Sequence, residues 1–62
     1  MKVGEKFHHV RNGVKYRYKV IREFKAPTPK HNDLIELQDL DTSELMLVEL
    51  EWFKQRDIKM GA

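Results

Sequence analysis

The dipeptide Asn12-Gly13, which lies between two runs rich in β-forming residues, constrains the fold of this chain more than any other feature. Residues 5–11 precede it and residues 14–25 follow it. An Asn-Gly pair in this setting predicts a type I′ turn, because both central residues of that turn need a positive φ. A two-residue turn also fixes how the residues of the two strands face each other.

Alternation along the second run assigns each side chain of this hairpin to a face. Apolar and aromatic residues recur at every second position, with lysine or arginine between them. Together with the register that the turn sets, this period of two separates a core face from a solvent face. We expect the core face to carry Phe7, His9, Tyr16, Tyr18 and Val20. We expect the solvent face to carry Lys6, His8, Val10, Lys15, Arg17 and Lys19.

Beyond the hairpin, the sequence predicts a loop, a third strand and a polar turn. Two prolines lie within residues 26–32, which excludes a central strand or a helix interior there. Residues 33–40 alternate again, and residues 41–44 are all polar. We therefore expect these three elements in that order.

Residues 45–53 are open to two interpretations. As a strand, this segment places Met46, Val48, Leu50 and Trp52 on one face. As a helix over residues 44–56, it forms an apolar stripe in a segment rich in good helix formers, and the fold would be α+β. We favour the strand, followed by a 3₁₀ turn at residues 53–57 and a short last strand that begins at Ile58.

The predicted strands form a β-meander in one domain over residues 1–62, with a tail at about residues 59–62. A chain of 62 residues has room for a single core. Bending such a sheet into a small barrel is the economical way to bury its ends. The fold class that we predict is therefore all-β.

The pattern resembles the small SH3-like barrels, above all short proteins of bacteria and bacteriophages with that fold. Residues 4–9 and 18–21 carry the resemblance, together with Val48-Glu49 followed by Phe53. It implies a five-stranded barrel that acts as a binding module, or as a phage-like inhibitory module on a host or partner protein. It does not specify a ligand. Proline-rich peptides are not expected, since the long loop is basic and Trp52 is the only tryptophan.

Charge is divided sharply between the two halves of the chain. Residues 1–31 hold nine Lys and Arg against two acids, a net charge of +7, and residues 32–62 hold three against eight, a net charge of −5. The solvent face of the hairpin contains no acid, so something should offset its repulsion. One candidate is an acid of the third strand, Glu36 or Asp39. The other is an anionic ligand such as a nucleic-acid backbone.

Two function classes follow, and both are non-catalytic. The first is nucleic-acid binding, to DNA or RNA, through the basic residues Lys6, His8, Lys15, Arg17 and Lys19. The second is a protein-interaction module, as a monomer or a homodimer, in which Trp52 and Phe53 form part of an interface if they stay exposed. Core packing is the alternative role for these two aromatic residues, and a core position with hydrogen bonds is the expected role of His9.

Several kinds of site are not expected. There is no cysteine, and adjacent His8 and His9 point to opposite faces of a strand, so we predict neither a metal site nor a cofactor. No glycine-rich phosphate loop or serine nucleophile motif is present, which argues against an enzyme. No apolar run approaches the length of a membrane span, and the first residues contain no signal sequence. A cytoplasmic location is the natural expectation.

Overall fold

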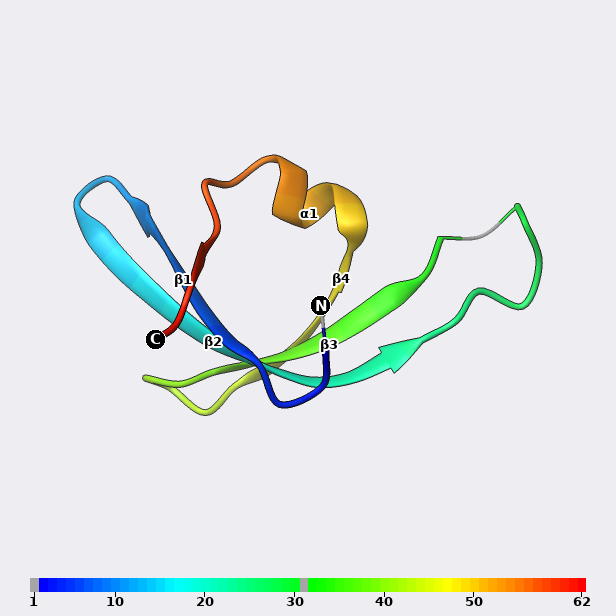
Figure 1. The fold of residues 1–62 in the computed structure, drawn as a ribbon, viewed down its shortest axis with the longest axis horizontal. Coiled ribbons are helices and arrows are strands. Elements are labelled where there is room, and N and C mark those ends of the chain that lie inside the picture. Colours follow the sequence, from blue (N-terminus) through cyan, green and yellow to red (C-terminus); the bar gives the residue numbers. More distant parts are fainter. Residues whose placement is uncertain (1, 31) are drawn as a thin grey trace.

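The computed structural model describes residues 2–30 and 32–62, which form one antiparallel sheet and one short helix. The strands are β1 (Lys6–Arg11), β2 (Val14–Phe24), β3 (Leu34–Asp39), β4 (Leu45–Glu49) and β5 (Lys59–Met60), and the helix is α1 (Leu50–Lys54). The strands lie in the order β4-β3-β2-β1-β5, so the last strand returns to the side of the first. The sheet is bent, and α1 lies over its concave side (Figure 1). The predicted meander of antiparallel strands is confirmed.

The hairpin formed by β1 and β2 has the predicted turn and register. Asn12 and Gly13 both have a positive φ, 53° and 78°, as a type I′ turn requires. The strands pair as Lys6 with Lys19, Phe7 with Tyr18, His8 with Arg17, His9 with Tyr16, Val10 with Lys15 and Arg11 with Val14. This is the register that a two-residue turn at Asn12-Gly13 dictates, so the assignment of side chains to two faces is confirmed.

β2 is the longest strand and the central one of the sheet, where it pairs with β1 and β3. Its register shifts between Val20 and Arg22, and a β-bulge of this kind bends the strand. The loop after β2 projects from one end of the molecule (Figure 1). Asp33 closes the base of this loop, because its carboxylate accepts the Ala26 N–H at 2.7 Å. The predicted loop at residues 26–32 is confirmed, although His31 lies outside the described residues.

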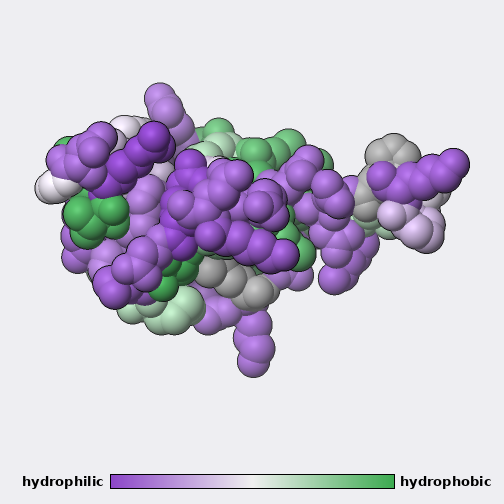
Figure 2. Space-filling view, turned by 90° about the horizontal axis from the view of Figure 1, so that it is seen from above, coloured by the Kyte–Doolittle hydropathy of each residue, from purple (hydrophilic) through white to green (hydrophobic). Residues whose placement is uncertain are grey.

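The core lies between the concave face of the sheet and α1. Its buried side chains come from four strands: Phe7, Tyr18, Val20, Ile35, Leu37 and Val48. Trp52 and Phe53 of α1 pack on this cluster, with ring centroids 6.2 and 5.5 Å from that of Phe7. Seen from the α1 side, the surface is mostly hydrophilic, with hydrophobic patches at its margins (Figure 2). α1 therefore turns its aromatic residues inward and its charged residues outward.

Both interpretations of residues 45–53 were wrong in part. β4 ends at Glu49, whose φ of −90° and ψ of 166° are extended, and α1 then spans residues 50–54. The strand therefore does not reach residue 53, the helix does not begin at residue 44, and α1 replaces the 3₁₀ turn expected at residues 53–57. The physical reason is Trp52-Phe53: a strand would point these neighbours to opposite faces, whereas the helix brings both against Phe7.

The C-terminal residues belong to the sheet and are not a free tail. β5 pairs with β1, with Met60 opposite Phe7 and Lys59 opposite His8. The Gly61 N–H also donates to the Lys6 carbonyl at 2.9 Å. The predicted short last strand is therefore present, although it begins at Lys59 and not at Ile58.

Candidate functional site

The basic face consists of Lys6, His8, Lys15, Arg17 and Lys19, and all five side chains lie on the sheet face away from the core. The Val20 N–H donates to the Glu5 carbonyl at 2.9 Å, so Glu5 and Val20 form a hydrogen-bonded pair. Hydrogen-bonded and non-hydrogen-bonded pairs alternate along an antiparallel ladder. Lys6 with Lys19 and His8 with Arg17 are therefore non-hydrogen-bonded pairs, the positions where opposed side chains come closest. The structure thus brings the predicted basic residues together where their mutual repulsion is greatest.

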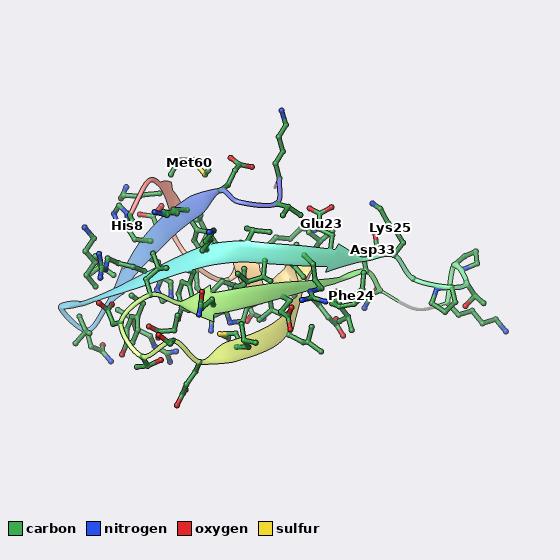
Figure 3. All side chains as sticks on the ribbon, turned by 90° about the horizontal axis from the view of Figure 1, so that it is seen from below. His8, Glu23, Phe24, Lys25, Asp33 and Met60 are labelled. Atoms are coloured by element: carbon green, nitrogen blue, oxygen red, sulfur yellow. The ribbon has the colours of Figure 1, made fainter. Side chains whose placement is uncertain are left out.

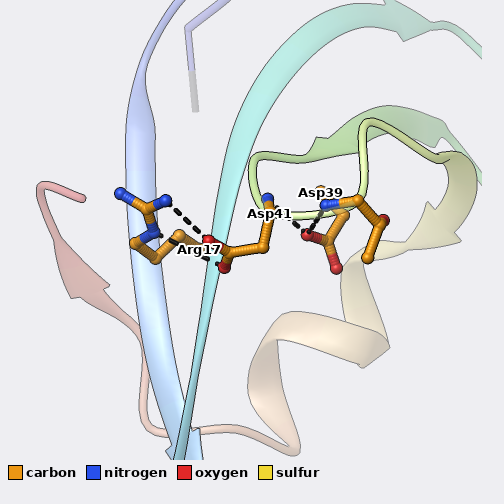
Figure 4. A network of polar contacts seen from close by, with 4 residues as sticks. Arg17, Asp39 and Asp41 are labelled. Carbon is orange, nitrogen blue, oxygen red and sulfur yellow. Dashed lines mark hydrogen bonds and ion pairs between the residues drawn. The ribbon is translucent and has the colours of Figure 1, made fainter.

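Arg17 is the member of the basic face with an acidic partner. Its Nη2 lies 2.6 Å from Asp41 Oδ1, in the loop between β3 and β4 (Figure 4). The side chain of Asp39 holds this loop, since its Oδ1 accepts the N–H groups of Asp41 at 2.8 Å and Thr42 at 3.1 Å. The hydrogen bond from Arg17 lowers the pKa of Asp41 below its usual range. The acids expected in this role have other tasks: Asp39 holds the loop, and Glu36 lies 2.7 Å from Arg22.

The three lysines of the basic face have no such partner. Within residues 2–30 and 32–62, Lys6, Lys15 and Lys19 form no ion pair with an acid. His8 has a structural contact instead, because its Nδ1 lies 2.6 Å from the Gly61 carbonyl oxygen and so ties β5 to β1. The face therefore presents three ammonium groups that form no ion pair with a described residue, while the charge of Lys15 also acts on Asp41 and helps to lower the pKa of that carboxyl.

Aromatic rings gather on the opposite face of the same hairpin. The His9 ring stacks between Tyr16 and Tyr18, at centroid distances of 5.2 and 5.7 Å, and meets Trp52 edge-on at 5.7 Å. Tyr18 is buried and Tyr16 is half-buried, as expected for core tyrosines. Trp52 and Phe53, the predicted interface residues, are also half-buried in this cluster. Their place in the structure is therefore against the core.

His9 occupies the predicted inward position, but its hydrogen bonding differs from the expectation. Its side chain is 4% exposed, and its Nε2 has no hydrogen-bond partner among the described residues. Burial, and then the nearby charges of Arg56 and Arg11, lower the pKa of His9 below 6.5. Burial therefore favours the neutral form of the ring. A buried polar atom without a partner costs about 1–3 kcal/mol, which the stacking rings around it must offset.

A hollow of about 360 Å³ opens beside His9 at the turn end of the hairpin. Tyr16, Trp52 and Met46 line its apolar side, and Arg11 and Arg56 line its charged side. The Arg56 guanidinium lies 4.1 Å from the centroid of the Trp52 ring and donates to the Trp52 carbonyl at 2.8 Å. This basic, aromatic hollow was not predicted. The four-residue spacing of Trp52 and Arg56 was the available signal, but such a spacing brings two side chains together only where the chain makes a helical turn.

A second surface feature is apolar and lies on the sheet face that carries the lysines, toward the other end of the molecule. Leu45 and Leu47 of β4 are 58% and 57% exposed, and Phe24 at the end of β2 is 42% exposed. Phe24, Leu34 and Leu47 line a hollow of about 330 Å³ together with Pro27 of the loop. Figure 3 shows Phe24 near Asp33 and Lys25 at the base of the loop, far from His8 and Met60.

Comparison with known proteins gives no relative: no protein-family model, curated protein or solved structure matches the chain. Among the described residues, no helix has the length and apolar character needed to cross a membrane. The same residues contain no group of three or more histidine, aspartate or glutamate side chains arranged to hold a metal ion. The basic face, the basic hollow and the apolar surface are therefore the candidate binding features of the described residues.

Proposed function

We propose that this protein is a non-catalytic module that binds nucleic acid through the basic face of its β1–β2 hairpin. One observation carries the proposal: Lys6, Lys15 and Lys19 share a sheet face and none forms an ion pair with a described residue. Lys6 and Lys19 also oppose each other directly, at a cost of a few tenths of a kcal/mol. A phosphate backbone offsets that repulsion and needs no shaped pocket, since phosphate contacts require charge and reach.

We also propose that the bent sheet is an SH3-like barrel. Two features support this fold: β5 returns to pair with β1, and a single helical turn, α1, separates β4 from β5. In this arrangement the inner face of the hairpin is occupied by the core. The outer face is left for a ligand, which agrees with the position of the lysines.

Replacing lysines on and off this face tests the proposal. One variant carries Lys6→Gln, Lys15→Gln and Lys19→Gln. A matched control carries Lys25→Gln, Lys30→Gln and Lys54→Gln, which removes the same charge from the loop and from α1. Fluorescence anisotropy measures the affinity for labelled single-stranded and double-stranded DNA and RNA.

The face variant should bind about a hundredfold more weakly at ~0.1 M salt. Counterion release favours binding, and each phosphate contact that is lost lowers the number of counterions released by about 0.7–0.9. The loss should be similar for every sequence, because phosphate contacts do not read bases. The control should lose far less affinity. Equal losses in both variants would contradict a defined face, and the absence of wild-type binding at low salt would refute nucleic-acid binding.

A second candidate function is protein interaction through the free edge of β4. Leu45 and Leu47 are exposed on β4, which in the described part of the chain pairs with β3 alone. An exposed apolar edge strand is a template for pairing with another chain, and a second copy of this chain is the simplest partner. Sedimentation equilibrium tests this directly. A wild-type dimer that Leu47→Lys converts to a monomer supports the interface, and a wild-type monomer at all concentrations contradicts self-association.

A further inference from the structure

The hollow beside His9 has the composition of a ligand site and not of a simple gap in the core. Its walls come from β1, the β1–β2 turn, β2, β4, the middle of α1 and the segment that follows α1. Among the described residues, two arginines, Arg11 and Arg56, line it and no acidic residue does, although Asp57 lines an adjoining hollow that shares both arginines. Arg56 is already held in place by the Trp52 ring and the Trp52 carbonyl. A guanidinium that is fixed in advance loses little side-chain freedom when it binds a phosphate.

His9 supplies an independent indication of a ligand. Its ring lines the hollow, its side chain is more than nine-tenths buried, and its Nε2 has no hydrogen-bond partner among the described residues. Buried polar atoms in folded proteins are almost always paired. A small group with a hydrogen-bonding edge that enters the hollow is able to supply the missing partner. One face of Tyr16 stacks on His9 and Arg56 covers one face of Trp52, so a planar ligand contacts the remaining ring surface that lines the hollow.

The hollow lies on the opposite sheet face from the lysines, at the turn end of the same hairpin. Arg11 ends β1 on the face of the hollow, whereas Lys15, which opposes Val10, lies on the basic face. A single strand that contacts both has to bend round the turn at Asn12 to pass from the lysines to the hollow. A base in a duplex is paired and stacked, whereas a base of a single strand is free to turn toward aromatic side chains.

We propose that this hollow binds one base of a single-stranded nucleic acid, with the base against Tyr16 and Trp52 and its phosphate between Arg11 and Arg56. The inference rests on the proposed function and makes it more specific, because it predicts a preference for single strands. The volume of about 360 Å³ lies within the range of small-ligand sites and suits one base. The lysines then supply affinity for the backbone, and the hollow distinguishes a strand with bases from a bare phosphate chain.

The intrinsic fluorescence of Trp52, the only tryptophan in the chain, measures occupancy of the hollow directly. Three probes are titrated: a single-stranded oligonucleotide, an abasic oligonucleotide of the same length, and a duplex. The oligonucleotide with bases should change the Trp52 emission and bind about tenfold or more tighter than the abasic strand, the range expected for base stacking. The duplex should leave the emission unchanged.

Two variants and a matched control complete the test. Arg56→Gln should weaken single-strand binding several-fold more than Lys54→Gln, which removes the same charge from the same segment outside the hollow. Tyr16→Leu, with an unchanged charge, should reduce the preference for the strand with bases, and thermal unfolding checks that each variant is folded. If both strands bind equally and the emission does not change, the base site is refuted while the basic face stands. If no probe binds at low salt, the proposed function itself is refuted.

Discussion

Reversal of one charge on the basic face should move stability and binding in opposite directions. Lys6 and Lys19 form a non-hydrogen-bonded pair in which neither side chain has an acidic partner among the described residues. Lys19→Glu replaces this repulsion with an attraction across the strands. An opposite-charge pair at this position contributes roughly 0.2–1 kcal/mol. In a domain of this size, half a kcal/mol raises the melting temperature by about 2–4 °C.

The same substitution should weaken nucleic-acid binding, because it removes a phosphate contact and adds a negative charge. Thermal unfolding followed by circular dichroism measures the first effect, and anisotropy with a single-stranded oligonucleotide measures the second. Lys6→Glu should behave in the same way. The double variant Lys6→Glu with Lys19→Glu restores like charges, so it should lose the gain in stability and bind more weakly than either single variant.

A double-mutant cycle separates this interaction from effects of each residue alone. Loss of stability in Lys19→Glu would show that Lys19 makes a favourable contact in the native state, and the reasoning from uncompensated repulsion would then be wrong. Additive stabilities in the cycle would show that the two ammonium groups do not interact. Either result would remove the argument that this face is built for an anionic ligand.

Three further predictions concern the fold. Gly13→Val should destabilise the domain by about 1 kcal/mol or more, because residue 13 has a φ of 78° and an added Cβ meets no atom within 4 Å, so the cost is conformational alone. Ser43→Gly should stabilise it by up to about 1 kcal/mol, since Ser43 holds a φ of 65°. The free energy of unfolding of the wild type should fall as the pH drops below 6.5, because His9 binds a proton more readily in the unfolded chain than in the folded state. The variant His9→Leu should flatten this dependence between pH 7.5 and 5.5.

Urea unfolding measures all three effects, and each has its own control. An equal loss in Gly13→Asn, which tolerates a positive φ, would contradict the conformational origin of the effect of Gly13→Val. A loss of stability in Ser43→Gly would show that the Ser43 side chain makes a contact that outweighs its strain. The pH window excludes Asp33 and Asp41, whose pKa values lie below 3.8, and an unchanged pH dependence in His9→Leu would refute the role of His9.

The hairpin was predictable because its signals are local. The turn type follows from Asn12-Gly13, and a two-residue turn leaves one register, so every side chain of β1 and β2 could be assigned to a face. The change from β4 to α1 was not predictable in the same way. Met46, Val48, Leu50 and Trp52 alternate as a strand does, and packing of two adjacent aromatic residues on Phe7 overrides that alternation after Glu49.

The sequence likewise predicts one part of the candidate site and not the other. The basic face needs only alternation and register, and its five residues were identified before the structure. The ion pair between Arg17 and Asp41 depends on the shape of a loop, and the hollow beside His9 depends on the position of α1. Both join parts of the chain that are distant in sequence and carry no periodic signal, so neither could be predicted.

The salt dependence of binding is the sharpest test of nucleic-acid binding through the basic face. The affinity of wild-type protein for a single-stranded oligonucleotide is measured over a range of salt concentrations, beside the variant with Lys6→Gln, Lys15→Gln and Lys19→Gln. The slope of log K against log salt should be shallower in the variant by about 2 to 3, since each phosphate contact contributes about 0.7–0.9. Equal slopes in the two proteins would show that these lysines do not contact phosphate, and would contradict binding through the basic face.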